Sequence, residues 1–435
     1  MLDTRFLKSK RFRRLSKEGF WIILGQAMAV VGALIGVRLV TALLEPAAYG
    51  ELALGMTVAT FVNQTLLGPL SNGVTRFYAP AVEKGNLGGY LSAVRRLVLS
   101  ATGIIILIIL FIVIGLVIAG RTEWIAIASA ALFFAILSGY NSILNGFQNA
   151  SRHRSIVALH QGMESWARFF VAVGFMLWLG ATSAVAMVGY AMANILVLGS
   201  QYIFLRKIVP GHIAEAESGR SWSKQIWKFA WPYASWGIFS WAQQVSDRWA
   251  LELFAKIQDV GLYAVLFQLG YYPMSMANGM AMQLLAPIMF QRAGDASDRR
   301  RNADVSKLCW RLTWVALGVT GAALCMGLLF HTQIFGLFVD KKYSSISHLL
   351  PWMLLSGGLF AAGQTFELNL VSQMKTPTIV VAKIITALLG VLLNFVCAYL
   401  FGITGIVFAS VLFSVLYSIW MMMLSQRTAS EICSQ

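Results

Sequence analysis

Long apolar runs recur along the whole chain, and they constrain its fold more than any other feature of the sequence. Each run is close to the roughly 20 residues that a helix needs to cross the hydrocarbon core of a bilayer. None shows the two-residue alternation of a barrel strand. The expected fold is therefore an all-α integral membrane protein with about twelve transmembrane helices. The predicted spans are residues 19–44, 52–75, 97–119, 124–147, 157–179, 183–205, 229–254, 260–290, 310–332, 347–371, 378–399 and 402–425.

The overall composition excludes an ordinary soluble domain. Hydrophobic residues make up 58% of the 435 residues and charged residues only 12%, with a mean hydropathy of +0.70. A soluble domain carries roughly a quarter of its residues as charged side chains. The first apolar run follows a basic segment and is too long for a cleaved signal peptide, so we expect it to remain as the first helix.

The net charge of +16 would suit a nucleic-acid partner, but the distribution of the basic residues argues against one. They alternate between loops, as the positive-inside rule predicts for a multi-pass membrane protein. The basic segments are 5–17, 84–96, 152–154, 206–228 and 292–307, with Lys375 and Arg427. The loops between them hold only Arg121, Lys256, Lys341 and Lys342. Both termini are therefore expected to be cytoplasmic.

An internal repeat divides the chain into two halves. The turn that ends at Gly50, after the first span, aligns with the turn that ends at Gly261, after the seventh. This alignment places Arg38 within one position of Arg248. Such a repeat predicts two six-helix lobes related by a pseudo-two-fold axis along the membrane normal. The expected organisation is a basic cytoplasmic segment 1–18, an N-lobe 19–205, a cytoplasmic linker 206–228, a C-lobe 229–425 and a cytoplasmic tail 426–435.

Two segments resemble a known family. Leu44-Glu45-Pro46-Ala47-Ala48-Tyr49-Gly50 is similar to the turn after the first helix of bacterial polysaccharide-biosynthesis flippases, within the multidrug/oligosaccharidyl-lipid/polysaccharide exporter superfamily. The stretch from Pro232 through Ser246-Asp247-Arg248 to Val265 resembles the start of their second lobe. The resemblance implies a V-shaped bundle in the bacterial cytoplasmic (inner) membrane. It would carry an undecaprenyl-pyrophosphate-linked oligosaccharide, such as an O-antigen or exopolysaccharide repeat unit, from the cytoplasmic to the periplasmic leaflet by alternating access.

The same resemblance indicates the expected binding partners and the alternative branches of the superfamily. The partners are the lipid-linked oligosaccharide, membrane lipids, and the polysaccharide polymerase and export machinery; no nucleic acid is expected. A sibling branch exports drugs, and another moves the peptidoglycan precursor on two additional helices, which fits a chain of about twelve spans less well.

Paired arginines are the main candidates for substrate binding. Arg38 and Arg248 lie roughly two turns from the outer ends of their helices, where they either snorkel to the headgroups or bind a pyrophosphate. One face of the seventh span carries Ser240, Gln243, Gln244 and Asp247. This spacing is typical of the wall of a wet cavity. Asp247 either holds Arg248 in place or is a proton or cation site.

Further binding candidates lie on the second and seventh spans. Arg76 follows Asn72 by one helical turn at the cytoplasmic end of the second span. Arg76 is either a positive-inside anchor or a contact for the pyrophosphate as the substrate enters. Trp241 lies in the middle of the seventh span, where it either belongs to the packing or stacks on a sugar ring.

The fifth span carries three ionisable groups on one stripe, at His160, Glu164 and Arg168. Glu164 and Arg168 either form a structural ion pair, or Glu164 is a carboxylate that couples transport to protons or sodium. Glu367 and Lys383 lie nearer to helix ends, where we expect each to snorkel.

Other function classes find less support in the sequence. A drug and cation antiporter is the nearest rival, and the excess of arginines over acids inside the spans favours an anionic substrate instead. A membrane glycosyltransferase or polymerase would need catalytic groups in a large external loop, whereas the external loops here are short. The chain has no phosphate-binding loop, no metal-ligand spacing and no nucleophile elbow. We expect no enzyme activity, cofactor or metal. Transport is expected to be coupled to a proton or sodium gradient.

Overall fold

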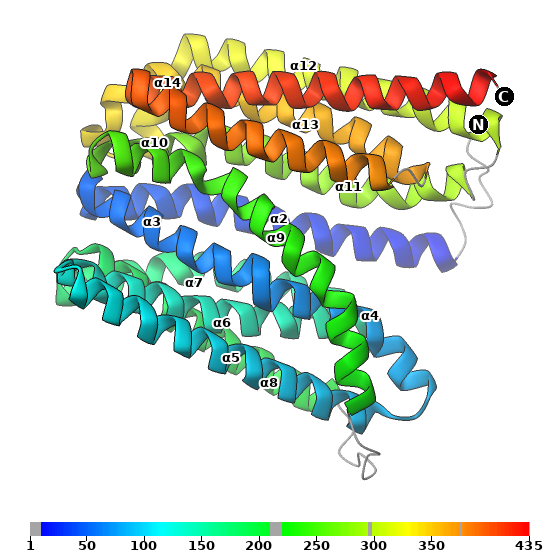
Figure 1. Ribbon diagram of the computed structural model, residues 1–435, viewed down its shortest axis with the longest axis horizontal. Helices are drawn as coiled ribbons and strands as arrows, with labels where there is room; N and C mark the ends of the chain where they lie inside the picture. Colours follow the sequence, from blue (N-terminus) through cyan, green and yellow to red (C-terminus); the bar gives the residue numbers. More distant parts are fainter. Residues whose placement is uncertain (1–9, 209–219, 295–297, 374–375, 435) are drawn as a thin grey trace. The chain divides into compact units, whose positions relative to one another are not determined.

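The computed structural model describes residues 10–208, 220–294, 298–373 and 376–434, and nearly all of them are helical (Figure 1). The helices of the first half are α2 (Lys10–Leu43), α3 (Pro46–Val62), η1 (Asn63–Leu67), α4 (Gly68–Glu83), α5 (Leu87–Ile118), η2 (Thr122–Trp124), α6 (Ile125–Ala150), α7 (Arg154–Leu179) and α8 (Ser183–Ile208). The others are α9 (Arg220–Phe254), α10 (Ile257–Leu269), α11 (Tyr271–Ala293), α12 (Arg299–Phe338), η3 (Lys341–Leu349), α13 (Leu350–Ser372) and α14 (Thr376–Ser434). The predicted all-α fold is confirmed.

The described residues form twelve helical segments when helices that follow one another without a loop are counted as one segment and α14 is counted as two. The π-helix η1 joins α3 directly to α4, and only Gly270 separates α10 from α11. Gly402, with φ +56°, divides α14 into two segments because only glycine adopts this conformation at low cost. Each of the twelve segments among the described residues overlaps one predicted span. Residues 1–9 of the predicted N-terminal segment, 209–219 of the linker and 435 of the tail lie outside the described residues.

The helices commonly extend beyond the apolar runs. The predicted span at residue 310, for example, belongs to α12, which begins at Arg299. Asp298 caps this helix by accepting hydrogen bonds from the backbone N–H groups of Arg300 (2.8 Å) and Arg301 (3.3 Å). Hydropathy locates the part of a helix that lies in lipid, whereas the capping residue determines where the helix begins. The predicted span therefore left out the polar first turns of α12.

Seven of the described helices are long and apolar enough to cross a membrane by length and composition alone. The α3 helix has 17 residues and α10 has 13, so each is too short by itself and spans only together with its continuation. Large apolar side chains cover the outer surface, with Phe111 70% exposed, Trp178 79% and Ile118 81%. A surface of this kind is stable in lipid and unfavourable in water.

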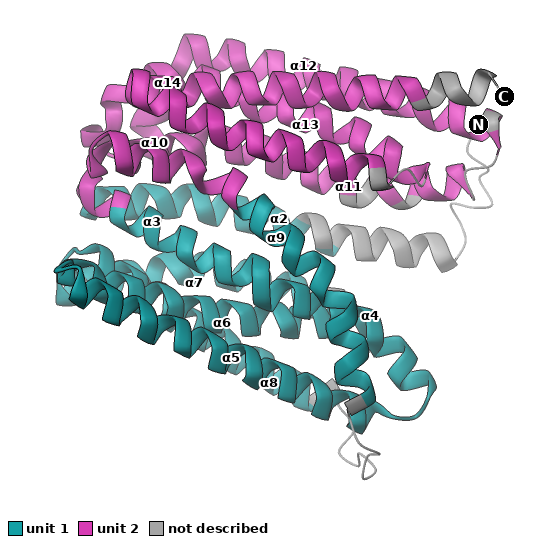
Figure 2. Cartoon of the chain, viewed as in Figure 1, with its two compact units in different colours: residues 1–44, 51–241 teal, residues 45–50, 242–435 magenta. Residues whose placement is uncertain are grey.

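Residue contacts divide the chain into two compact units (Figure 2). Unit 1 contains residues 1–44 and 51–241, and unit 2 contains residues 45–50 and 242–435. The division falls inside α9, whereas the sequence analysis placed it in the linker 206–228. The first part of α9 belongs to unit 1 because Gly237 lacks a side chain where its backbone approaches the carbonyl oxygen of Gln64 in η1.

Three helix pairings occur in both units, as an internal repeat predicts. In unit 1, α6 packs against α4, α5 and α8, and in unit 2, α13 packs against α11, α12 and α14. A polar contact recurs as well. Gln201 donates a hydrogen bond to the Oδ1 of Asn145 (3.1 Å) in unit 1, and Asn369 donates one to the Oγ of Ser425 (2.8 Å) in unit 2.

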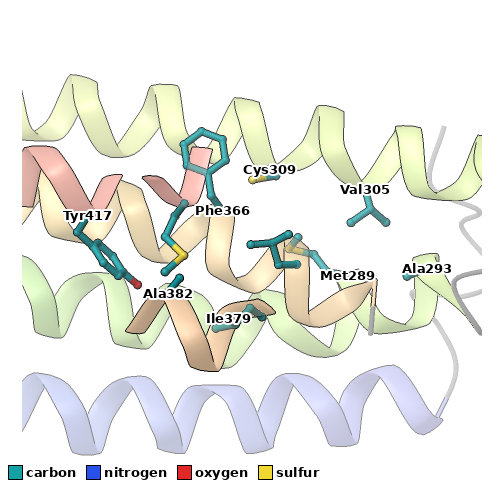
Figure 3. Close-up of a cluster of buried hydrophobic side chains, with 10 residues drawn as sticks. Met289, Ala293, Val305, Cys309, Phe366, Ile379, Ala382 and Tyr417 are labelled. Atoms are coloured by element: carbon teal, nitrogen blue, oxygen red, sulfur yellow. The ribbon is translucent and has the colours of Figure 1, made fainter. Parts of the chain in front are cut away.

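A hydrophobic cluster forms the core of one end of unit 2 (Figure 3). Met289 of α11, Cys309 of α12, Phe366 of α13 and Tyr417 of α14 contribute to it, so four helices meet there. Cys309 is a free, buried thiol.

The two glycines that align the repeat contact each other's helix within unit 2. A Cβ atom on Gly50 would collide with the carbonyl oxygen of Ile257, and one on Gly261 would collide with the carbonyl oxygen of Pro46. Ile257 lies four residues before Gly261, and Pro46 lies four residues before Gly50, so the two glycines make equivalent, reciprocal contacts. This close approach of two helix starts requires glycine on both sides.

We predict that Gly261→Ala destabilises the protein by about 1–3 kcal/mol, because the new methyl group meets backbone that has no room to move. The control is Gly279→Ala in α11, where a Cβ atom meets nothing within 4 Å. Alanine is the better helix former, so the control should equal or exceed the wild type in stability. Thermal unfolding of the purified protein in detergent measures both. Equal unfolding temperatures for Gly261→Ala and the wild type would contradict the close contact.

Candidate functional site

A transmembrane segment is interrupted at corresponding positions of the two halves. In the first half the π-helix η1 interrupts α3 and α4, and the cap N–H of Gly68 donates to the carbonyl of Asn63. In the second half the chain breaks at Gly270, between α10 and α11. Short or interrupted spans at corresponding positions of two repeats indicate a transport site, and π-helices are frequent at functional sites. The two breaks therefore mark a candidate transport site.

Arg248 lies beside the second break. Its guanidinium carbon is 4.7 Å from the centre of the Phe267 ring, in the last turn of α10. Its Nη1 donates to the backbone carbonyl of Gln244 (3.1 Å) and to Oδ1 of Asp247 (3.2 Å). Its side chain is only 14% exposed. A snorkelling arginine would extend into the headgroups, whereas Arg248 is held inside unit 2.

Asp247 is the residue that positions this arginine. The carboxylate is buried and accepts hydrogen bonds from the Tyr263 hydroxyl (2.8 Å) and the backbone N–H of Arg248 (2.7 Å), in addition to the guanidinium. A buried carboxylate is stable when its lone pairs are satisfied in this way. Of the two readings left open for Asp247, the contacts favour the holding role.

The two other predicted residues of α9 lie in different places. Gln243 is half-buried in unit 2, where its Cγ packs near Gly390 of α14. Trp241 belongs to unit 1, where its indole N–H donates to the backbone carbonyl of Thr57 (2.8 Å). Its ring also meets Phe61 edge to face, at 4.9 Å between centroids. These contacts connect Trp241 to α3, one turn before the π-helix.

A polar cavity of about 520 Å³ lies within unit 1. Three helices line it, α4, α6 and α7. The lining residues are Ser71, Asn72, Thr75, Ser138, Ser142, Asn145, Gly146, Asn149, Gln161 and Glu164. Two predicted residues, Asn72 and Glu164, are thereby brought together. All the lining side chains are polar except the glycine, and Glu164 is the one charged group among them. This cavity can hold water and ions at membrane depth.

Glu164 is half-buried and pairs with Arg168 one turn later. The Nη2 of Arg168 donates to Oε1 of Glu164 at 3.0 Å. The guanidinium also lies over the rings of Phe134 (5.5 Å) and Tyr190 (5.9 Å). The aromatic rings hold the cation on one side, so the carboxylate remains at the cavity wall. The predicted Glu164–Arg168 pair is present.

His160 lies on the same helix but has a different environment. It is fully buried, its Nδ1 lies 2.8 Å from the carbonyl of Ile156, and its Nε2 lies 3.1 Å from the hydroxyl of Ser200 in α8. Since a carbonyl can only accept, Nδ1 carries a proton and Nε2 of the neutral ring accepts from Ser200. The histidine therefore joins α7 to α8 and does not line the cavity.

The two other predicted arginines, Arg76 and Arg38, differ in exposure. Arg76 is exposed on α4, one turn beyond Asn72. Arg38 is half-buried in α2 of unit 1, and its backbone carbonyl accepts from the Thr41 hydroxyl (3.2 Å). The structure describes Arg38 and Arg248 in different units.

Glu367 and Lys383 do not snorkel separately as expected. The Nζ of Lys383 lies 2.5 Å from Oε1 of Glu367, and the Tyr417 hydroxyl donates to Oε2 at 2.7 Å. The two residues lie on neighbouring helices, so each neutralises the other and the cost of burying a charge falls. The sequence did not indicate this ion pair, because the two residues are 16 positions apart on different helices and share no helical spacing.

Sequence reasoning also missed most of the cavity wall on α6. Ser138, Ser142, Asn145 and Asn149 line it. Their spacing of four, three and four residues places them on one helical face, which is a readable signal. The partners of Arg248, Tyr263 and Phe267, carried no such signal because aromatic residues are common throughout the chain.

Comparisons with known proteins identify a family for this chain. The family described as "Polysaccharide biosynthesis protein" matches residues 15–292, more than half of the chain. No curated protein sequence matches it.

Solved structures of two transporter classes share the fold. An inward-facing multidrug resistance MATE family transporter of the MOP superfamily is 13% identical, with a TM-score of 0.66, and 96% of each chain is covered. An outward-facing structure from the same family gives 15% identity and a TM-score of 0.63, covering 100% of this chain and 99% of that one. The lipid II flippase MurJ, in an inward closed conformation, is 15% identical with a TM-score of 0.67, covering 95% of this chain and 88% of MurJ.

These likenesses show a common fold at low sequence identity, and the family match covers the segments that resembled polysaccharide-biosynthesis flippases. The chain thus belongs to the polysaccharide biosynthesis protein family and has the all-helical transporter fold of the MOP superfamily.

Proposed function

We propose that this protein moves a polyprenyl-pyrophosphate-linked oligosaccharide from the cytoplasmic to the periplasmic leaflet of the bacterial cytoplasmic membrane. The observation that carries the proposal is the position of Arg248, held by Asp247 and Phe267 beside the break between α10 and α11. An arginine fixed at membrane depth suits a pyrophosphate because its planar fork binds phosphate oxygens bidentately.

The guanidinium retains unused hydrogen-bonding capacity. Among the described residues its hydrogen bonds involve Nη1, while Nη2 and Nε are directed to no protein acceptor. A guanidinium has five N–H donors, so a pyrophosphate can bind without displacing Asp247. Arg38 is the corresponding arginine of the other repeat, and we propose it as a second anion-binding residue. Arg76, exposed next to Asn72, is proposed to meet the substrate on entry.

Unit 1 is proposed to supply the coupling. Glu164 presents a carboxylate to a polar cavity whose wall also carries hydroxyl and amide oxygens. A proton or a sodium ion at this carboxylate would compete with Arg168 and change the charge of the cavity. A difference in cation affinity between two transport conformations is what couples an ion gradient to translocation.

The orientation and partners follow from sequence and family. Basic residues in alternate loops favour cytoplasmic termini, which we retain as a proposal. The membrane lipids surround the exposed apolar faces, and the polysaccharide polymerase and export machinery are proposed to receive the product. The proposal includes a glycan of either the O-antigen or the exopolysaccharide type, since both use a pyrophosphate-linked lipid.

A cation or drug antiporter is the second candidate. Its supporting observation is that Glu164 is the one charged side chain that lines the cavity of unit 1. An acidic cavity attracts cations, whereas the held arginine of unit 2 attracts anions. The family match favours the lipid-linked glycan, and the solved MATE structures share the fold alone.

We predict that Arg248→Lys lowers polysaccharide export by about tenfold, because lysine retains the charge but loses a charge-assisted hydrogen bond of about 1.5 kcal/mol. Arg248→Ala should be worse, and the Arg38→Ala/Arg248→Ala double variant should export nothing. Surface polysaccharide is measured in cells, with the amount of membrane protein checked by immunoblot. Arg206→Ala is the control, since Arg206 also lies over a ring, that of Tyr202 (4.8 Å), but is exposed. Normal export by a well-expressed double variant would refute the anion site.

We predict that Glu164→Gln uncouples export from the proton or sodium gradient, because the amide cannot lose a proton or bind a cation by charge. Export should become insensitive to the gradient that drives the wild type, measured after collapse of each gradient with an ionophore. Glu83→Gln, at an exposed carboxylate at the end of α4, is the control and should behave as the wild type. Wild-type gradient dependence in Glu164→Gln would make the residue structural.

A further inference from the structure

Unit 2 contains a row of five aromatic side chains, Phe267, Tyr271, Phe360, Phe413 and Tyr417, here called the aromatic row. The rings of Phe267 and Tyr271 are 4.8 Å apart at 18°, and Tyr271 continues to Phe360 at 5.9 Å and 35°. Phe360 meets Tyr417 at 4.8 Å and 31°, and Phe413 at 6.1 Å and 30°. Successive planes are therefore close to parallel. The row crosses from α10 through α11 and α13 to α14.

Each end of the aromatic row carries charged groups. At one end the guanidinium of Arg248 lies over Phe267 at 4.7 Å. At the other end the Tyr417 hydroxyl donates to Glu367, which pairs with Lys383. Rings that run between an anion-binding arginine and a second polar cluster form a surface that is apolar in its middle and polar at its rim.

Packing against the hydrophobic cluster in Figure 3 accounts for only part of this row. Four of its members, all but Tyr417, are half-buried, whereas the residues of the hydrophobic cluster in Figure 3 are buried. Tyr417 belongs to that buried cluster, and Phe360 and Phe413 pack against it, whereas Phe267 and Tyr271 neither belong to it nor pack against it. Some other aromatic pairs of the unit meet edge to face, such as Trp310 with Phe366 at 76° and Phe254 with Phe395 at 89°. The row thus combines near-parallel planes with incomplete burial.

Sugar rings fit this surface better than a polyprenyl chain. The C–H face of a sugar packs on an aromatic ring, and its hydroxyl groups find donors and acceptors at Glu367, Lys383 and Tyr417. A polyprenyl chain has no polar groups, so it would leave those side chains without ligand contacts while desolvating them.

We infer that the aromatic row is the binding surface for the glycan, with the sugar rings lying along it while Arg248 binds the pyrophosphate. This inference rests on the proposed function, because it needs a pyrophosphate-linked glycan as substrate. It adds a sugar subsite in unit 2 and assigns its residues. Phe360 is the central member, since it meets three other rings of the row.

The test compares two lipids that differ only in the sugar. One is undecaprenyl pyrophosphate carrying a disaccharide, and the other is undecaprenyl pyrophosphate alone. Binding to the full-length protein in nanodiscs is measured for the wild type, Phe360→Leu, Phe413→Leu and Arg248→Gln. Phe395→Leu is the matched control, because Phe395 is also half-buried in unit 2 but packs on Phe254 (6.2 Å), away from the row.

The wild type should bind the disaccharide lipid more tightly than the bare lipid. Phe360→Leu and Phe413→Leu should each weaken binding of the disaccharide lipid by about two- to tenfold and leave binding of the bare lipid unchanged. Phe395→Leu should change neither affinity, and Arg248→Gln should weaken both. Size-exclusion profiles and unfolding temperatures identify any variant that misfolds, and a variant that keeps the wild-type profile and unfolding temperature carries the test.

Two results would overturn the inference in different ways. Equal affinity of the wild type for the two lipids, or equal weakening of both by the row variants, removes the sugar subsite and leaves the pyrophosphate site intact. Failure of the wild type to bind either lipid contradicts the proposed function, and the sugar subsite with it.

Discussion

In the hydrocarbon core of a bilayer, a polar side chain finds hydrogen-bonding partners only in the protein or in enclosed water. This constraint organises the interior of both units. Asn141 donates to Oδ1 of Asn194 (2.8 Å), His160 bonds Ser200, and Glu367 pairs with Lys383. Each of these contacts joins two helices, so it also specifies which helices pack together. Two openings in this interior present charged groups that the proposed function uses, the cavity of unit 1 and the surroundings of Arg248.

The two units differ in the charge that they present at these openings. The cavity of unit 1 presents Glu164, and Arg168 beside it is held by two aromatic rings. In unit 2 the arrangement is the reverse, since Asp247 is buried and accepts three hydrogen bonds, while Nη2 and Nε of Arg248 donate to no acceptor among the described residues. The repeat thus gives related scaffolds with opposite local electrostatics. In the proposed function, one binds the driving cation and the other binds the anionic substrate.

The sequence predicted the positions of the helices well, but it predicted poorly which side chains pair between helices. Hydropathy placed every transmembrane segment because lipid requires long apolar runs, and the aligned glycines Gly50 and Gly261 revealed a contact that the structure contains. The π-helix at Asn63–Leu67 was missed because a single extra residue in a helical turn changes neither hydropathy nor composition. The pairing of Glu367 with Lys383 was missed because it depends on packing between two helices.

The central claim is that the cargo is a pyrophosphate-linked glycan rather than a cationic drug. The most direct measurement reconstitutes the purified protein in liposomes that carry such a lipid and follows how much of its sugar becomes accessible to a membrane-impermeant oxidant. The account predicts accelerated exposure of the sugar in protein-containing vesicles under an imposed proton or sodium gradient, and no uptake of a cationic dye. Uptake of the dye with no movement of the lipid would contradict it.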